Sequence, residues 1–276
     1  MNIKIIYFSA TGNTAKIADA ISETLEAYEN ISVEKLNITS FSSRENNPSL
    51  DKYDGIFFGF PIYALRAPKM LREWIKTLKG NNQKVSAFFT YGGVTVGIAH
   101  HNIKKILEDK NFQVVSTGEF LGKHTSNLAG WNLMNDRPNQ EDLDIAKEYA
   151  EKTLMRFMGK DVGIVNFDNP EMTEKQVDRI EDSSNKRRIP PSRQGTDCSM
   201  LCKMCKTCEE DCPTNAMNAE SGEADPERCI GCLRCVNNCP DKALKIADRK
   251  KMYGVIAKAL NLSEEVLANR KSKYFL

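Results

Sequence analysis

The sequence predicts an α/β fold, in which a doubly wound five-stranded parallel sheet is followed by a small α+β domain rich in cysteine. Three observations predict this fold. From residue 1 to about 160, apolar strand-like runs alternate with helical patterns, which is typical of a parallel sheet covered by helices on both faces. All nine cysteines lie between Cys198 and Cys239, and within that segment one spacing of cysteine and proline occurs twice.

The expected strands are continuously apolar or β-branched, as strands buried on both faces should be. They cover residues 3–8, 31–38, 55–60, 85–90 and 112–120. Apolar residues at helical spacing predict helices around 17–25, 71–78, 103–107 and 143–158. His100 and His101 fall on the third of these helices, where we expect them at the surface.

Four segments follow from these patterns. We expect a sheet domain at 1–160, a connector at 161–196, a cysteine domain at 197–248 and a basic tail at 249–276. The connector holds one short polar helix candidate (172–182) and a basic stretch at 186–188, which we expect to be solvated. The tail has one short amphipathic helix candidate, at 260–267.

Composition excludes several classes of protein. The 276 residues include 39 basic and 37 acidic ones, and the resulting net charge of +2 argues against a dedicated nucleic-acid binder. No apolar run approaches the roughly 18 residues of a membrane helix. The first apolar run, six residues long, is too short for a secretory signal. We therefore expect a soluble, cytoplasmic protein without a membrane partner.

The repeated cysteine pattern is C-x2-C-x2-C-x3-C-P, and each cysteine of the first run has its equivalent 27 positions later. In such a pattern three cysteines ligate one iron–sulfur cluster and the fourth reaches the neighbouring cluster. The spacing thus assigns Cys202, Cys205, Cys208 and Cys239 to one 4Fe–4S cluster, and Cys229, Cys232, Cys235 and Cys212 to the other. Structural zinc is the alternative, but zinc ligands usually come in two separated pairs.

The segment of about 50 residues around these cysteines resembles a bacterial two-cluster ferredoxin. Six basic and ten acidic residues lie between Asp197 and Asp248, a balance of −4 that favours a basic docking partner. Cys198 falls outside both runs. It is either a spare or buried thiol, or a replacement ligand or redox group.

Three loops of the sheet domain follow strands and can bind a ligand at the carboxyl edge of the sheet. The first, S-A-T-G-N-T at residues 9–14, offers hydroxyls, a glycine and free amides to a phosphate. It lacks the lysine of an NTPase loop and the G-x-G-x-x-G of a nicotinamide site. A turn with a helix cap is the simpler interpretation of such a cluster. The other two loops, at 59–64 and 90–93, carry small residues and tyrosines.

With these loops, the first 160 residues resemble flavodoxin-like FMN-binding domains. The resemblance implies FMN, with its phosphate held by Ser9, Thr11, Gly12, Asn13 and Thr14. It places the isoalloxazine ring between two loops, Pro61, Ile62, Tyr63 and Ala64 on one side and Thr90, Tyr91, Gly92 and Gly93 on the other. The whole chain, including segments 60–68 and 118–124, looks like the flavodoxin–ferredoxin fusion family of anaerobic bacteria and archaea.

These features predict an electron-transfer flavoprotein in which two 4Fe–4S clusters exchange electrons with FMN and with redox-protein partners, a ferredoxin among them. The alternative is an FMN-dependent reductase of a small substrate, with His124, Asn127 or Trp131 over the ring. A redox sensor is the third interpretation. Residues 1–160 hold 20 basic and 18 acidic residues, whereas free flavodoxins are usually strongly acidic. Such a near-neutral domain could receive electrons from its own acidic ferredoxin domain, and an external acidic ferredoxin could also dock on the basic connector or tail. The sequence leaves a homodimer open.

Overall fold

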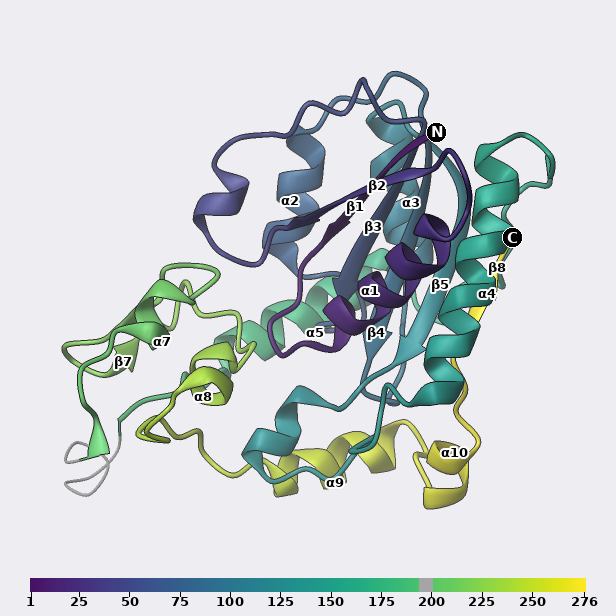
Figure 1. Cartoon of the computed structure of the whole chain (residues 1–276). Helices are drawn as coiled ribbons and strands as arrows, with labels where there is room; N and C mark the ends of the chain where they lie inside the picture. Colours follow the sequence, from purple (N-terminus) through teal and green to yellow (C-terminus); the bar gives the residue numbers. More distant parts are fainter. Residues whose placement is uncertain (194–200) are drawn as a thin grey trace.

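The computed structural model describes residues 1–193 and 201–276. Its centre is a six-stranded sheet in the order β2-β1-β3-β4-β5-β8 (Figure 1). All five expected parallel strands are present, each within one residue of its predicted limits. They are β1 (Asn2–Tyr7), β2 (Ser32–Asn37), β3 (Gly55–Pro61), β4 (Lys84–Tyr91) and β5 (Gln113–Leu121).

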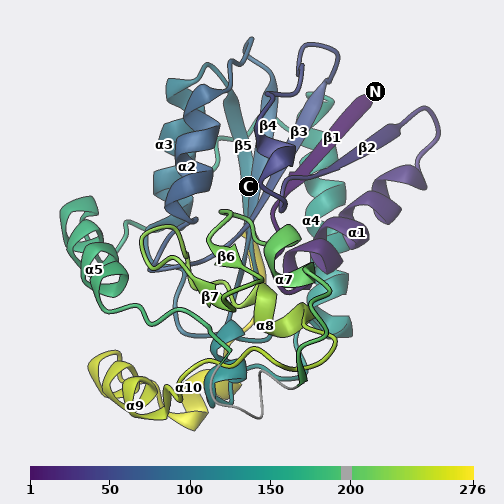
Figure 2. The same ribbon diagram turned by 90° about the vertical axis from the view of Figure 1, so that its left-hand side faces the viewer.

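Helices cover both faces of this sheet, as Figure 2 shows. On one face α1 (Asn13–Glu26) and α4 (Gln140–Phe157) pack over a core that includes Ile17 and Tyr149. On the other, α2 (Lys69–Thr77) and α3 (Ala99–Asp109) pack over a core that includes Leu71 and Ile103. The expected doubly wound architecture is confirmed.

The two edges of the sheet differ from the prediction. We expected β2 to be buried on both faces, but all six of its residues are exposed or half-buried, because it is an edge strand that pairs with β1 alone. At the opposite edge a sixth strand, β8 (Lys273–Phe275), pairs antiparallel with β5. These residues belong to the segment that we expected to form a basic tail. Ser272 fixes this segment, since its hydroxyl donates to Asp142 Oδ1 at 2.5 Å and accepts from Leu121 N at 2.9 Å.

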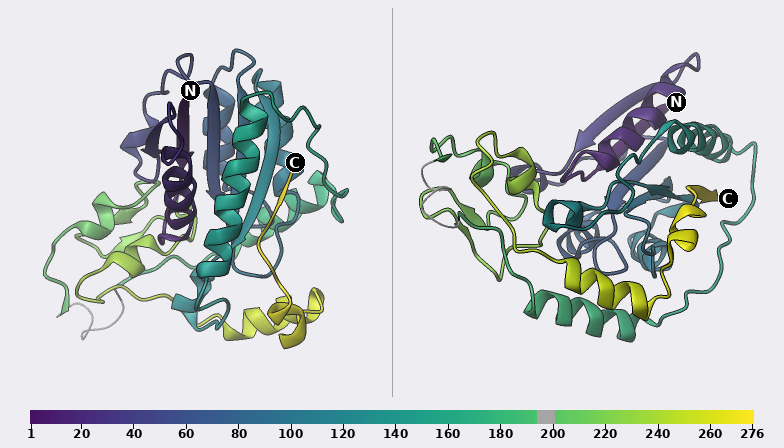
Figure 3. Two further views of the ribbon diagram at one scale, coloured as in Figure 1. Left: turned by 45° about the vertical axis from the view of Figure 1, so that its right-hand side comes forward. Right: turned by 90° about the horizontal axis from the view of Figure 1, so that it is seen from below.

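The rest of the tail forms two short helices, α9 (Lys250–Ala259) and α10 (Glu264–Ala268), instead of the single helix expected at 260–267. The helix is interrupted there because Ser263 acts as an N-cap, its Oγ accepting from Val266 N at 3.1 Å. Figure 3 shows the tail running from the cysteine-rich region back to the sheet. Across the part of the chain that the structure describes, none of the helices combines the length and apolarity of a membrane span.

The cysteine-rich region lies beyond the carboxyl ends of the strands (Figure 1). It contains α7 (Thr207–Glu210), α8 (Arg234–Asn238) and a two-stranded sheet of β6 (Met217–Asn218) and β7 (Glu223–Ala224). Ser192, expected in the connector, forms bridges with Glu223 and Lys245 of this region.

The connector is packed against the sheet domain. Its helix α5 (Glu174–Lys186) begins with a capping box at Thr173. Glu181 of this helix is buried between two buried arginines, with its carboxylate 2.5 Å from Arg66 Nη2 and 2.7 Å from Arg72 Nη2. The stretch 186–188, expected to be solvated, is half-buried at Arg188, which donates to the backbone oxygen of Cys229.

His100 is another departure from the prediction, because it is buried. Its Nδ1 lies 2.9 Å from Thr117 Oγ1 and its Nε2 lies 2.9 Å from Glu119 Oε2. The position three residues before Ile103 places His100 on the inner face of α3.

His124 precedes the short helix η2 (Thr125–Ala129) and packs on Trp131, which in turn contacts the tail. Its Nδ1 accepts from Ser126 N at 3.0 Å, and its ring centroid lies 4.5 Å from that of Trp131. Trp131 packs on Tyr253 of α9 and donates from Nε1 to Arg249 O at 2.8 Å. Burial, with Arg249 nearby, lowers the pKa of His124 to about 4.

The ion cluster at Glu181 yields a stability prediction. Glu181→Ala leaves two buried guanidinium groups without their shared carboxylate, and we expect it to lower the free energy of unfolding by about 3–5 kcal/mol. Asp178→Ala is the matched control, since Asp178 also pairs with Arg66 but its side chain is 58% exposed; we expect a loss of about 0–1 kcal/mol. Urea unfolding measures both variants, and equal losses would contradict this account.

The lowered pKa of His124 predicts a pH dependence. The unfolded chain takes up a proton near pH 6.5 whereas the folded chain does so only near 4, so this contribution to stability is present above pH 6.5 and is lost as pH falls toward 4. The slope reaches about 1.4 kcal/mol per pH unit for one group. His124→Asn retains a capping oxygen but does not titrate. Urea midpoints at pH 7 and pH 5 should therefore fall further for the wild type than for the variant; parallel falls would refute the assignment.

Candidate functional site

The three predicted loops meet at the carboxyl edge of the sheet, after β1, β3 and β4. Thr14 Oγ1, from the first loop, lies 2.7 Å from Thr90 Oγ1, from the third. Ile62 N, from the second loop, donates to Thr90 O at 2.9 Å. Parallel strands end at one edge, so residues far apart in the sequence form one continuous surface there.

The first loop presents a run of backbone amides. Among the hydrogen bonds within residues 1–193 and 201–276, none uses the N–H groups of residues 10 to 14 as donors. Helix α1 starts at this point without a side-chain cap, and Gly12 before it has φ +96°. Ala10 and Thr14 are buried, so these amides are the kind of orphan donors that a phosphate satisfies at a helix N-terminus.

Side chains around the loop fix its shape. Ser9 Oγ accepts from Ala15 N at 3.1 Å, and Ser9 N donates to Thr39 Oγ1 at 2.8 Å. Asn13 Nδ2 donates to Lys123 O at 2.9 Å. Sequence reasoning missed Thr39, which follows the exposed strand β2 and carries no motif.

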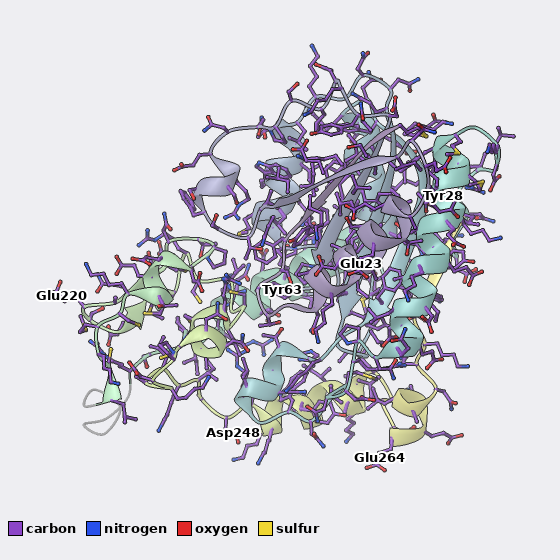
Figure 4. The ribbon with its side chains drawn as sticks, in the orientation of Figure 1. Glu23, Tyr28, Tyr63, Glu220, Asp248 and Glu264 are labelled. Carbon is purple, nitrogen blue, oxygen red and sulfur yellow. The ribbon has the colours of Figure 1, made fainter. Side chains whose placement is uncertain are left out.

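The second and third loops approach their neighbours closely. Tyr63 lies where the sheet domain meets the cysteine-rich region (Figure 4), and burial together with the Cys232 thiol raises its pKa. A Cβ on Gly92 would lie 2.2 Å from the His124 ring, so only glycine fits there. The two tyrosines differ in exposure. Tyr63 is half-buried, whereas the side chain of Tyr91 is buried near Glu119, and burial raises the pKa of Tyr91 as well.

The three candidates for a substrate-facing role have structural partners. His124 and Trp131 pack on each other, and Trp131 also packs on α9. Asn127 bonds Leu133 twice, donating to its backbone oxygen at 2.7 Å and accepting from its N–H at 3.0 Å. These contacts explain the positions of the three side chains without a role in substrate binding.

The cysteines of the described ranges surround two hollows, of about 380 and 310 Å³ with their openings to solvent included. Three cysteines of one run and the fourth of the other line each hollow. The first set is Cys202, Cys205, Cys208 and Cys239, and the second set is Cys212, Cys229, Cys232 and Cys235. No three His, Cys, Asp or Glu side chains in 1–193 and 201–276 are grouped for a single metal ion. The donor set, four thiols around a shared space, fits a cluster. Cys198 lies outside the described residues.

The two halves share hydrogen bonds to sulfur. Ala216 N donates to Cys212 Sγ at 3.2 Å, and 27 positions later Ala243 N donates to Cys239 Sγ at 3.3 Å. Such N–H···S bonds are among the means by which a protein adjusts the potential of a cluster.

The surroundings of the two sets differ. In the first, Cys205 is exposed, and hydrogen bonds from the Met204 backbone N–H and from Arg193 lower the pKa of Cys202. In the second, burial and the neighbouring thiols of Cys229 and Cys212 raise the pKa of Cys232 to about 12. Cys232 also belongs to the apolar core of the sheet domain, so the second set is the inner one.

Two arginines join the second set to the sheet domain. Arg234 Nη1 donates to Ser9 O and Ala10 O, at 3.3 and 3.1 Å. Arg44 donates to the backbone oxygen of Pro213, next to Cys212. Sequence reasoning missed both, although the repeat offered a signal for Arg234, whose equivalent in the first run is Thr207.

Comparison with known proteins bears on both parts of the chain. A family described as "Flavodoxin domain" matches residues 4–131, and two described as "4Fe-4S binding domain" match 199–215 and 223–245. A flavodoxin from Clostridium saccharobutylicum is 30% identical over 157 residues, which are 55% of this chain and 94% of that protein.

Two further proteins are similar to parts of the chain. One component of an ion-translocating oxidoreductase complex from Methanosarcina acetivorans is 39% identical over 51 residues, 18% of this chain and 19% of that protein. The crystal structure of oxidised Flavodoxin 2 from Bacillus cereus has a TM-score of 0.42 at 18% identity, covering 58% of this chain and 100% of that one.

The match over nearly the whole length of a flavodoxin and the two 4Fe–4S matches agree with the fold and with the two halves of the site. The chain belongs to the flavodoxin family, and it is an electron-transfer flavo-iron–sulfur protein in which the flavodoxin domain is followed by 4Fe–4S ferredoxin-type domains.

Proposed function

We propose that this protein transfers electrons between two 4Fe–4S clusters and FMN, and that it joins one-electron redox-protein partners to the one- or two-electron chemistry of the flavin. The observation that carries the proposal is the position of the second cysteine set. Cys232 packs in the core of the sheet domain together with Ile62 and Tyr63 of a predicted ring-binding loop. This packing supports a proposed inner cluster site that lies beside the proposed flavin site.

The FMN phosphate would bind the amide run of the first loop. The N–H groups of residues 10 to 14, which have no acceptor among the described residues, would donate to the phosphate, and the helix dipole would favour its negative charge. The candidate residues are Ser9, Thr11, Gly12, Asn13 and Thr14. The ring would lie between Pro61–Ala64 and Thr90–Gly93, where Gly92 lies against the His124 ring and Tyr63 is half-buried.

The first and second cysteine sets would each hold one cluster. Because Cys205 of the first set is exposed whereas the second set is mostly buried, a protein partner would exchange electrons at the first set. Electrons would then pass through the second set to the flavin. The reductase alternative is less well supported, since His124 and Trp131, its candidate substrate contacts, pack on each other beside α9.

The cofactor content tests the proposal. Anaerobically reconstituted protein should hold about eight iron atoms and one FMN per chain, and a reductive titration should consume about four electrons. Cys205→Ser and its repeat equivalent Cys232→Ser should each retain about four iron atoms. Half the iron in the wild type, or complete loss in either variant, would count against two independently ligated clusters.

Gly12→Ala isolates the role of the phosphate loop. A Cβ at Gly12 meets nothing within 4 Å, so the cost comes from its φ of +96°. We expect the unbound loop to relieve a strain of about 1–2 kcal/mol that FMN binding restores, which corresponds to a roughly 5- to 30-fold rise in the Kd for FMN, measured by quenching of flavin fluorescence. Gly254→Ala is the control, because a Cβ there is equally free and its backbone is helical. An unchanged Kd for Gly12→Ala would remove this loop from the FMN site.

A further inference from the structure

Arg234 lies between two cysteines of the second set and connects that set to the phosphate loop. Its Nη1 donates to Ser9 O and Ala10 O, at 3.3 and 3.1 Å. Its Nε donates to Asp211 O at 3.1 Å, and its Nη2 lies 3.2 Å from Asp211 Oδ1. Asp211 precedes Cys212, so one guanidinium group contacts both cofactor sites.

The ligand pattern itself does not require an arginine here. The equivalent residue of the first run, 27 positions earlier, is Thr207, whose hydroxyl oxygen lies 3.4 Å from Cys205 Sγ within its own loop. Two halves that share cysteine spacing and N–H···S bonds thus differ at this position. The difference falls on the half that faces the sheet domain.

The contact acts on the groups that would bind phosphate. In a trans peptide the C=O and the following N–H point in opposite directions. Because the carbonyls of Ser9 and Ala10 face Arg234, the N–H groups of Ala10 and Thr11 face the other way. These are the first two amides of the run that has no acceptor among the described residues. Arg234 therefore holds the loop in the orientation that an anion needs.

A second arginine supports the same segment from the sheet domain. Arg44 donates to Pro213 O and, at 3.1 Å, to Thr39 O, while Thr39 Oγ1 accepts from Ser9 N. The chain on both sides of Cys212 is thus bonded to residues that position the phosphate loop. The segment that carries Cys212 and the phosphate loop are therefore joined through hydrogen bonds.

We propose that Arg234 is a positioning residue that couples the two cofactor sites, so that a cluster in the second set strengthens FMN binding. By thermodynamic linkage, FMN strengthens retention of that cluster by the same factor. The inference rests on the proposed function only in placing FMN at the first loop and a cluster at the second set. The first set, whose Cys205 is exposed, has no part in the coupling.

Binding of FMN to arginine variants is the first test. We expect Arg234→Gln to raise the Kd for FMN about tenfold, since a hydrogen-bonded charge is removed from two carbonyls, and Arg234→Lys to restore part of the loss. Arg228→Gln is the matched control: Arg228 also neighbours a cysteine of the second set, but it pairs with Asp225 at 2.7 Å and its side chain is 57% exposed. Its Kd should stay within about twofold of the wild type.

Removing one cluster at a time is the second test, and it uses the half-buried repeat equivalents Cys208 and Cys235. Cys235→Ala should raise the Kd for FMN about tenfold, whereas Cys208→Ala should leave it within about twofold. The double variant Cys235→Ala/Arg234→Gln should bind FMN no more weakly than Cys235→Ala alone, because both changes remove one pathway.

Retention of iron gives the reciprocal readout. FMN should slow the loss of iron to a chelator in the wild type but not in Arg234→Gln. Equal FMN affinity of Arg234→Gln and wild type, or equal effects of the two cysteine variants, would overturn the coupling while leaving the proposed function intact. Failure of the wild type to bind FMN would instead overturn the proposed function. If Arg234→Gln does not fold, Arg234→Lys and the cysteine pair decide the question.

Discussion

The structure depends on one constraint, the convergence of parallel strands at a single edge of the sheet. The loops after β1, β3 and β4 can form one site only because these strands run in the same direction and pair as neighbours. The cysteine-rich region lies beyond that edge, and Arg234 bonds to the loop after β1 there. Parallel strands are joined by crossover connections, which are usually helical, so α1, α2 and α3 are consequences of the same constraint.

The tail and the connector both join the cysteine-rich region to the sheet domain. The tail returns from the cysteine-rich region, packs α9 against Trp131, and finishes as β8 at the edge of the sheet. In the connector, Glu181 of α5 pairs with Arg66, close to the loop at 61–64. The cysteine-rich region is therefore held to the sheet domain by segments on both sides of it in sequence. Such a connection limits the motion of the second cysteine set relative to the loops.

Sequence periodicity predicted the sheet well, because buried parallel strands and helices have strong apolar patterns. Cysteine spacing likewise predicted the two sets that line the hollows, since in this repeated pattern the fourth cysteine of each run joins the set of the other run. The failures concern long-range contacts. The surroundings that bury His100, Arg188 and Trp131 come from distant segments, and no local pattern encodes them. The edge strand β8 is only three residues long, and it exists because β5 offers unpaired backbone groups.

The internal repeat shows how one sequence pattern serves two environments. Equivalent cysteines line both hollows, and equivalent amides bond to sulfur in both, so the repeat preserves what a cluster needs. The intervening residues differ. Cys205 is exposed where Cys232 packs in the core of the sheet domain, and Thr207 stands where Arg234 reaches the phosphate loop. Exposure and hydrogen bonding are both means by which a protein shifts the potential of a cluster, so the two sets offer different environments to the clusters that we propose they hold.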